Sequence, residues 1–254
     1  MNPPQKTGYR EIAAAIRKEI LAGIYPPASL LPSESELARR YGASRSLANR
    51  ALGLLAAEGL VHPQQGRGTV VTWLPPMVHS ATRYSQTTRE KDGARGAFDS
   101  EVKAIGLVPK HEITVEHVEP PVEIAEALGM EAGELCLVRR RRLLASGIPV
   151  RLNASWFPLS IAENTVLEEP APVITGGVKS ALAELGYPQI AARERIVPSR
   201  LPTDAEASLL EISPERSVTD IVHFGQTADG RVVEVTTTLT PAHYLIIEHE
   251  FPLI

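Results

Sequence analysis

Residues 44–53 present several side chains that donate hydrogen bonds, and no carboxylate lies among them. At 100° per residue, the polar members of this stretch and one glycine fall on a single face of a helix. They are Arg45, Ser46, Asn49, Arg50 and Gly53. Arginine can bond O6 and N7 of guanine together, and asparagine can bond N6 and N7 of adenine. A solvated helix face is the alternative, but such faces usually mix acids with bases. The pattern therefore favours contact with base edges in a DNA major groove.

Helices are predicted to hold that face in place. The helix itself is expected over about 44–58, ended by Gly59, because apolar residues recur on its other side. Those residues are Leu47, Ala48, Ala51, Leu54 and Leu55. Just before it, Ser33 and Glu36 form a capping-box pattern that begins a shorter helix. A first helix over about 9–22 carries isoleucine at positions 12, 16 and 20. Together these elements predict a helix-turn-helix.

A short hairpin is expected after the helices. Residues 60–61 and 70–71 are apolar and bracket a turn with two glycines around Arg67. Glycine lets a backbone approach a groove closely, and an arginine there can meet phosphate or a narrow minor groove. The expected DNA-binding residues are Ser33, Ser44 and Thr69 for phosphates, Arg45, Asn49 and Arg50 for bases, Gly66 and Arg67 for the hairpin, and Glu34, Ser46 and Gly68 beside them.

Six short motifs follow one another within residues 31–69: LPSE, ELA, YG-x-SR, AL-x-x-L, EGL and GRGT. Their order resembles the winged helix-turn-helix domain of the GntR family of bacterial transcription regulators, over nearly all of residues 9–72. The resemblance implies that Arg45 reads bases and that Gly66 or Gly68 enters the minor groove. Asn49 departs from the family pattern, which often has an arginine at that position.

Charge is unevenly distributed along the 254 residues. Residues 1–72 contain nine Lys or Arg and five Asp or Glu, a net charge of +4, so the remainder carries −8 of the overall −4. A basic segment attached to an acidic body suits a protein whose first part meets a phosphate backbone. It does not suit a chain that coats nucleic acid along its whole length.

The sequence does not indicate a disulfide, a membrane span, a metal site or a catalytic motif. Cys136 is the single cysteine, so no disulfide within the chain is expected and a reducing compartment is natural. No apolar run reaches the length of a membrane span, and the first residues lack the apolar core of a signal peptide, so we expect a cytoplasmic protein. The seven histidines are scattered, and neither a metal, a cofactor nor a catalytic motif is predicted.

The second part of the chain predicts a separate domain. Residues 73–96 are polar and lack periodicity, which predicts a linker between a domain at 1–72 and one at 97–254. Helices are expected near 98–105, 122–128, 178–185 and 203–210, and strands near 113–115, 135–144, 150–157, 218–226, 231–238 and 244–248. Strands outnumber helices and the connections are short, so an α+β fold with a mainly antiparallel sheet is expected.

Four consecutive arginines, 139–142, lie on one of these strands. Alternation places Arg139 and Arg141 on one face. An inward guanidinium needs a carboxylate, a phosphate or a ligand acid, whereas a strand with one wet face would need none. Glu234, Thr236 and Thr238 also alternate on one face, where they could complete a pocket; the β-propensity of threonine explains the pair equally well.

The segment ASGIPVRLNASWFP, residues 145–158, resembles part of the UTRA effector-binding domain in the HutC-type branch of the GntR family. That domain has a fold similar to chorismate lyase. The resemblance implies that Arg141 holds an anionic group of the effector. It places Asn153 where many relatives have glutamate. The expected effector-binding residues are Phe98, Asp99, Arg139, Arg141, Asn153, Ser155, Glu234, Thr236 and Thr238.

The leading hypothesis is a ligand-responsive repressor of transcription. Two copies are expected to pair through the second domain and to place two recognition helices on a near-palindromic operator in double-stranded DNA. A small molecule, anionic by the argument above, would release the protein. Two alternatives remain: a lyase-like enzyme acting on an aromatic acid, and a DNA-binding protein that senses nothing.

Overall fold

The computed structural model describes residues 8–85, 96–170, 174 and 176–250. The chain forms two compact units that divide between Pro75 and Pro76, except that Ser146–Ile148 group with the first unit. No described helix is long and apolar enough to cross a membrane.

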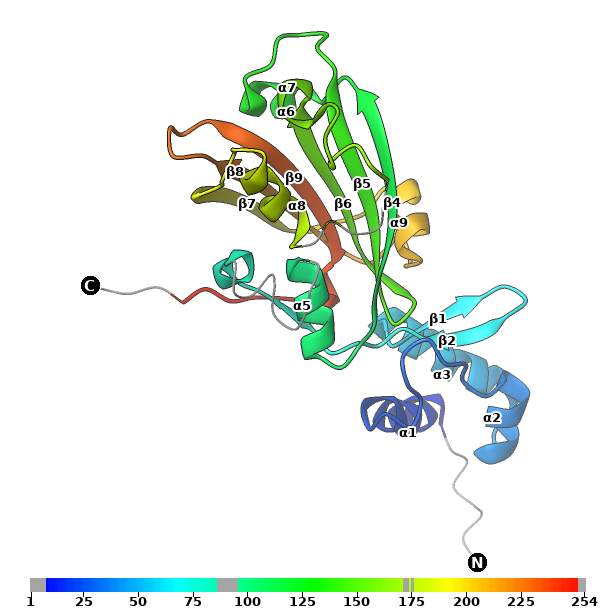
Figure 1. The fold of residues 1–254 in the computed structure, drawn as a ribbon. Helices are drawn as coiled ribbons and strands as arrows, with labels where there is room; N and C mark the ends of the chain where they lie inside the picture. The colour runs from blue at the N-terminus through cyan, green and yellow to red at the C-terminus, as the bar shows by residue number, and fades with distance from the viewer. Residues whose placement is uncertain (1–7, 86–95, 171–173, 175, 251–254) are drawn as a thin grey trace, which may run out of the picture. The chain divides into compact units, whose positions relative to one another are not determined.

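The first unit contains three helices and a hairpin (Figure 1). The helices are α1 (Tyr9–Leu21), α2 (Glu34–Arg40) and α3 (Arg45–Glu58). Strand β1 (Val61–Gln64) pairs antiparallel with β2 (Gly68–Val71). This confirms the expected winged helix-turn-helix.

Local signals in the sequence set the ends of these helices. The Ser33 hydroxyl accepts the Glu36 amide while the Glu36 carboxylate accepts the Ser33 amide, which is the predicted capping box. Gly59 ends α3 with a left-handed φ of 80°, a conformation that favours glycine. Leu52 is buried in the core, whereas Leu54, which was expected there, is half-buried. Leu54 still packs against that core, and Leu52 joins it because the fully buried stripe follows i, i+4 and i+7 from Ala48.

The second unit is built on one six-stranded antiparallel sheet, in the order β4-β5-β6-β9-β8-β7. The strands are β4 (Pro109–Val118), β5 (Cys136–Ala145), β6 (Ile148–Pro158), β7 (Ala191–Arg200), β8 (Val218–Gln226) and β9 (Val232–Pro241). The helices are α5 (Ala97–Ala104), α6 (Val122–Leu128), α7 (Leu159–Ala162), α8 (Gly177–Glu184) and α9 (Asp204–Leu210). The expected α+β class with a mainly antiparallel sheet is confirmed.

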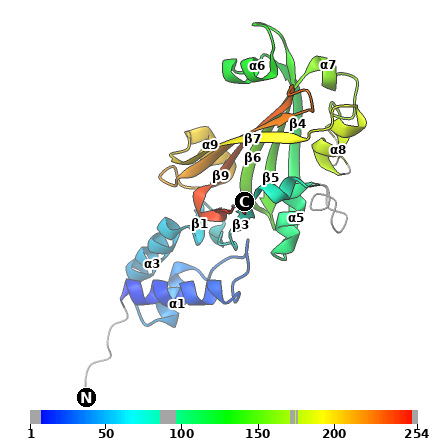
Figure 2. The same cartoon turned by 90° about the vertical axis from the view of Figure 1, so that its left-hand side faces the viewer.

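Both faces of the sheet are covered (Figure 2). Helices α7 and α8 pack on the face that includes Leu137 and Phe157. Helix α6 packs on the other face, against Val138 and Trp156, and α9 covers the same side near Leu239. Neighbouring residues such as 137 and 138 therefore enter different cores, as the two-residue period of a strand requires.

Part of the stretch that was expected to be linker is ordered secondary structure. Strand β3 (Met77–His79) pairs in parallel with β10 (Leu245–Ile247), and the 3₁₀ helix η1 (Ala81–Tyr84) follows. Residues 86–95 of the expected linker lie outside the described residues. Strand β7 was not predicted, because it is an edge strand with charged residues and a proline.

Candidate functional site

The predicted polar face of α3 lies on the surface of the first unit. Arg45, Ser46, Asn49, Arg50 and Gly53 are all exposed. The opposite face packs into the core through residues that include Ala48, Ala51 and Leu55. Since the core holds one face of the helix, the other is free to lie in a groove about 12 Å wide.

A carboxylate from α2 joins two of these side chains. Glu34 Oε2 accepts a hydrogen bond of 2.8 Å from Arg45 Nε, and Glu34 Oε1 accepts one of 2.6 Å from Asn49 Nδ2. The bonds from Asn49 and then Arg45 lower the pKa of the Glu34 carboxyl. The Arg50 guanidinium lies 4.2 Å from the centre of the Tyr9 ring. Glu34 thus holds Arg45 and Asn49, the two side chains best suited to reading bases, side by side in the free protein.

The tip of the hairpin is also exposed. Gly66 and Gly68 have φ of 75° and 106°, so glycine is the residue that fits these positions. Arg67 is exposed and donates to the Gln64 side chain at 3.2 Å. Ser33 and Ser44 are exposed helix N-caps, and Thr69 is partly buried on β2. Every residue predicted to contact DNA therefore lies at or near the surface of the first unit.

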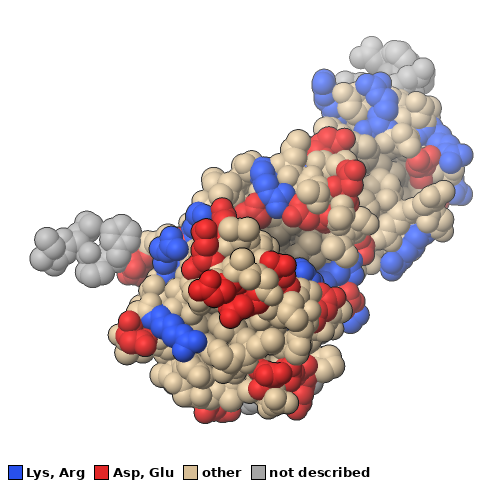
Figure 3. Space-filling view, turned by 90° about the horizontal axis from the view of Figure 1, so that it is seen from above, with Lys and Arg blue, Asp and Glu red and all other residues tan. Residues whose placement is uncertain are grey.

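Figure 3 shows how charged side chains are distributed on one side of the protein. Lys and Arg side chains predominate at the upper right of the view, and Asp and Glu side chains form several groups over the rest, with some Lys and Arg side chains between them.

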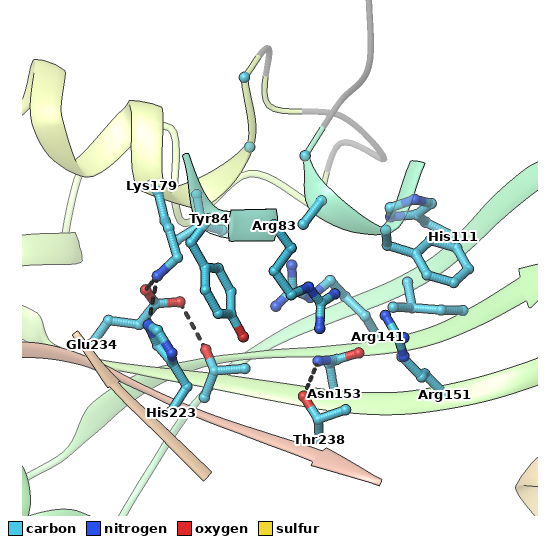
Figure 4. A pocket seen from close by; sticks show the side chains of 18 residues that line it. Arg83, Tyr84, His111, Arg141, Arg151, Asn153, Lys179, His223, Glu234 and Thr238 are labelled. Carbon is cyan, nitrogen blue, oxygen red and sulfur yellow. Dashed lines mark hydrogen bonds and ion pairs between the residues drawn. The ribbon is translucent and has the colours of Figure 1, made fainter. Parts of the chain in front are cut away.

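The second unit holds a cavity of about 120 Å³, which we call the cationic cavity (Figure 4). Its walls come from η1, α5, α8 and strands β4, β5, β6, β8 and β9. Its polar and charged lining consists of Arg83, Tyr84, His111, Arg141, Arg151, Asn153, Lys179, His223, Glu234, Thr236 and Thr238. Side chains from segments far apart in the sequence therefore converge on one small space.

Three arginines line this cavity. Arg141 donates to the Ser155 hydroxyl at 2.6 Å, and burial lowers its pKa. Arg83 and Arg151 share the Glu101 carboxylate, at 2.7 Å from each. Burial also lowers the pKa of Arg151, because its guanidinium loses the solvation it would have in water.

The opposite wall is a hydrogen-bonded network of charged and neutral groups. Glu234 accepts from Gln189 at 2.7 Å and from Thr236 at 2.7 Å, and pairs with Lys179 at 3.3 Å. Burial raises the pKa of Glu234, but the neighbouring Lys179 and the hydrogen bonds outweigh it and leave the pKa low. Lys179 also contacts His223 Nε2 at 2.8 Å. This wall is therefore electrostatically satisfied, whereas the arginine wall is not.

The nine residues predicted to bind effector fall into three groups by their position relative to the cavity. Six line the cavity: Phe98, Arg141, Asn153, Glu234, Thr236 and Thr238. Asp99 and Ser155 lie behind them, with Asp99 2.7 Å from His111 Nε2 and Ser155 bonded to Arg141 and Thr236. Arg139 is not part of the lining.

Arg139 has a different partner from the one expected. It is buried, at 2% exposure, and donates to the backbone carbonyls of Leu167 and Glu169. Burial lowers its pKa to about 10, with the neighbouring Arg141 second in effect. Arg139 shares a face with Arg141, as predicted, but the segment after α7 covers that end of the strand. Its guanidinium therefore holds a loop in place.

Several lining residues were not predicted. Arg151 precedes Asn153 on the same strand face, so alternation alone could have indicated it. Arg83 and Tyr84 fall in the expected linker, and Lys179 and His223 lie on elements with no distinctive motif. Only the folded chain brings these four together.

A second hollow, of about 610 Å³, lies on the other face of the sheet beside α9. Its residue Arg142 already has partners: Glu112 at 3.0 Å, Glu211 at 2.7 Å and the Leu209 carbonyl at 2.6 Å. Arg140, on the same face, pairs with Glu116 at 3.3 Å. The cationic cavity is the better candidate for an anionic ligand because its arginines retain unpaired donors. The described residues contain no group of three or more His, Cys, Asp or Glu arranged to hold a metal ion.

Comparison with known proteins agrees with both units. Residues 8–71 match the model for bacterial regulatory proteins of the gntR family, and residues 105–245 match the UTRA domain. An HTH-type transcriptional regulator of Streptomyces coelicolor is 29% identical over 236 residues, which cover 91% of this chain and 87% of that protein. The histidine utilization repressor of Pseudomonas aeruginosa is 28% identical over 232 residues, covering 91% of this chain and 85% of that protein.

A solved structure of a GntR-family transcriptional regulator is 26% identical, with a TM-score of 0.60 over 97% of this chain and 98% of that chain. The UTRA match by itself spans more than half of the sequence. The chain therefore belongs to the UTRA-domain transcription regulators, with a GntR-type helix-turn-helix at its N-terminal end.

Proposed function

We propose that the protein is a repressor that binds operator DNA through the exposed face of α3 and leaves it when a small anion occupies the cationic cavity. The family consists of transcription regulators, which favours this function over a lyase-like enzyme. The observation that carries the proposal is the exposed face of α3, which contributes no acid of its own and on which Glu34 of α2 holds Arg45 and Asn49 side by side.

The proposed contacts follow from chemistry and position. Arg45, Asn49 and Arg50 are assigned to bases, because their side chains match the donor and acceptor pattern of the major groove. The hairpin glycines and Arg67 are assigned to the minor groove or the adjacent phosphates. Ser33, Ser44 and Thr69 are assigned to phosphates, which fix the position of the helix without reading sequence. Two copies would bind an inverted repeat whose half-sites are about one helical turn apart.

The effector end of the proposal rests on Arg141. The Arg141 side chain is half-buried, its Nε is fully enclosed, and it contacts a neutral hydroxyl, so an oxyanion beside it would supply the opposite charge that an enclosed guanidinium needs. Occupancy can lower DNA affinity only if the anion binds the DNA-free state more tightly than the DNA-bound state. A repressor of this kind would act in the cytoplasm, where its operator lies.

Two experiments test the proposal. Purified full-length protein is mixed with a pool of random-sequence duplexes, and the bound fraction is amplified and sequenced; an inverted repeat is expected, and the absence of any enriched sequence would refute DNA reading by α3. Thermal unfolding is then measured with added phosphate or acetate at constant ionic strength. The unfolding temperature should rise in the parent but not in Arg141→Met. Equal behaviour of the two proteins would refute the assignment of the effector site.

A further inference from the structure

Among the side chains that line the cationic cavity, three buried polar atoms have neither a hydrogen-bond partner nor an ion-pair partner among the described residues; a fourth buried atom, Arg83 Nε, lies 2.7 Å from Glu101 Oε1. Of the three, two are donors, Arg141 Nε and Arg151 Nη2, and one is an acceptor, Asn153 Oδ1. All three side chains line the cavity (Figure 4). A buried polar group without a partner is strongly disfavoured, so this set specifies what an occupant has to offer.

The two donors call for negative charge. Arg151 is 2% exposed and its other terminal nitrogen donates to Glu101 at 2.7 Å, but that carboxylate is shared with Arg83. Arg141 contacts the neutral Ser155. Three other carboxylates lie nearby, and each already has partners. Asp99 is bonded to His111, and Glu194 to His79 and His223. Glu234 is bonded to Gln189 and Thr236 and paired with Lys179. An oxyanion between Arg141 and Arg151 would therefore be held by two guanidiniums.

The single acceptor calls for a neutral donor. Asn153 already donates its amide hydrogen to the Thr238 hydroxyl at 2.6 Å, so its carbonyl oxygen is the atom left to accept. An ammonium group could donate to it, but its positive charge would lie close to two arginines and be repelled. A hydroxyl donates without that repulsion. The cavity volume of about 120 Å³ corresponds to only a few water molecules, which suits a small ligand.

We propose that Arg151 and Asn153 form, together with Arg141, a subsite for an oxyanion that carries a neighbouring hydroxyl group. The effector class is then a small hydroxy acid or a hydroxyl-bearing phosphate ester. Arg151 holds the anion, and Asn153 selects the hydroxyl over an amine. This inference rests on the proposed function, which already assigns an anion to Arg141, and adds a second arginine and the hydroxyl requirement.

Matched probes test the inference. Lactate, propionate and alanine differ at one position, which carries a hydroxyl, a hydrogen or an ammonium group. The phosphate series is 2-hydroxyethyl phosphate, ethyl phosphate and 2-aminoethyl phosphate. Binding of each to the full-length protein is measured by calorimetry and thermal unfolding at constant ionic strength. The hydroxyl compound should bind about tenfold more tightly than either analogue in at least one series, as expected for one added hydrogen bond to a buried group. Comparison of the two series identifies whether carboxylate or phosphate is the preferred oxyanion.

Variants separate the roles of the side chains. Arg151→Met should weaken the favoured probe by about ten- to a hundredfold, as loss of a charged hydrogen bond predicts. Asn153→Asp should remove the preference for hydroxyl over ammonium, because the introduced carboxylate attracts the ammonium group electrostatically. Arg140→Met, on the opposite face, is the matched control and should bind like the parent. Circular dichroism and the ligand-free unfolding temperature show whether each variant has folded.

The outcomes distinguish the two proposals. If simple anions stabilise the parent but the hydroxyl gives no advantage and Arg151→Met binds normally, this inference is wrong and the proposed function stands. If a misfolded Arg151→Met is recovered, the probe series on the parent and Asn153→Asp still decide the question. If no anion of either series binds the parent, both the inference and the effector site are refuted.

Discussion

The contact between Glu34 and the two base-reading side chains leads to a prediction about specificity. Glu34 accepts hydrogen bonds from Arg45 and Asn49 at 2.8 and 2.6 Å, while Arg45 remains 74% exposed. In non-specific complexes the base edges offer no replacement for these bonds. Glu34 is thus expected to orient both side chains and to offset one positive charge until matching bases are found.

The change to make is Glu34→Gln, which keeps the shape and removes the charge. An exposed ion pair of this kind contributes about 0.2–1 kcal/mol. Loss of orientation at two side chains should therefore lower the ratio of operator to non-specific affinity by about three- to tenfold. Because one cation is no longer offset, the slope of log affinity against log salt concentration should steepen by about 0.9.

Fluorescence anisotropy measures the affinity of each protein for the selected operator and for a scrambled duplex, between about 50 and 200 mM salt. Glu58→Gln is the matched control, since Glu58 pairs with Arg17 on the same unit and its exposure is similar. It adds the same charge without touching α3's base-reading pair. If both variants keep the parent's affinity ratio, Glu34 does not orient the reading side chains.

Three further predictions concern stability. Arg139→Met should lower the free energy of unfolding by about 2–4 kcal/mol in urea titrations, because one buried and one partly buried carbonyl lose their donor; Arg140→Met should change it by less than about 0.5 kcal/mol. Bonds from Arg200 lower the folded pKa of Glu206 from 4.5 to about 2, so this carboxylate stabilises the fold above about pH 4.5 and the effect is lost as the pH falls towards 2. Glu206→Gln should therefore be about 1–2 kcal/mol less stable than the parent at pH 7, and this difference in unfolding free energy should shrink as the pH is lowered. A difference that does not change with pH would contradict the pairing of Glu206 with Arg200. Gly53→Ala should raise the unfolding free energy by about 0.5–1 kcal/mol, since Gly53 is an exposed helix residue with open space around it, and a loss of stability would contradict that placement.

Features encoded by neighbouring residues were predictable from the sequence. Both capping boxes, at Ser33 and Thr203, are present, and Gly59 ends its helix as expected. Alternation along β5 correctly placed Arg139 and Arg141 on one face of the sheet and Arg140 and Arg142 on the other. Arg141 bonds to Ser155, whereas Arg140 and Arg142 pair with Glu116 and Glu112. These signals work because capping and strand alternation depend on a few consecutive residues.

Features that depend on distant residues were not predictable. β3 forms because it pairs with β10, at the other end of the chain. Arg83 reaches the cavity only because that segment is part of the second unit and pairs with Glu101. The sequence predicted the face of the sheet on which Arg139 lies but not its hydrogen-bond partners. The loop that supplies these carbonyls begins 28 residues later in the chain. Sequence patterning thus identified most of the cavity lining on the strands and missed the residues that come from elsewhere.

The central claim is that Arg45 on the exposed face of α3 reads a base. Replacing each guanine of the selected operator in turn by 7-deazaguanine removes the N7 acceptor and leaves base pairing intact. In the parent, one substitution per half-site should weaken binding by about 1–3 kcal/mol, and in Arg45→Ala the same substitution should have no further effect. If every substitution weakens the parent and Arg45→Ala equally, Arg45 does not contact a guanine and the proposed orientation of α3 is wrong.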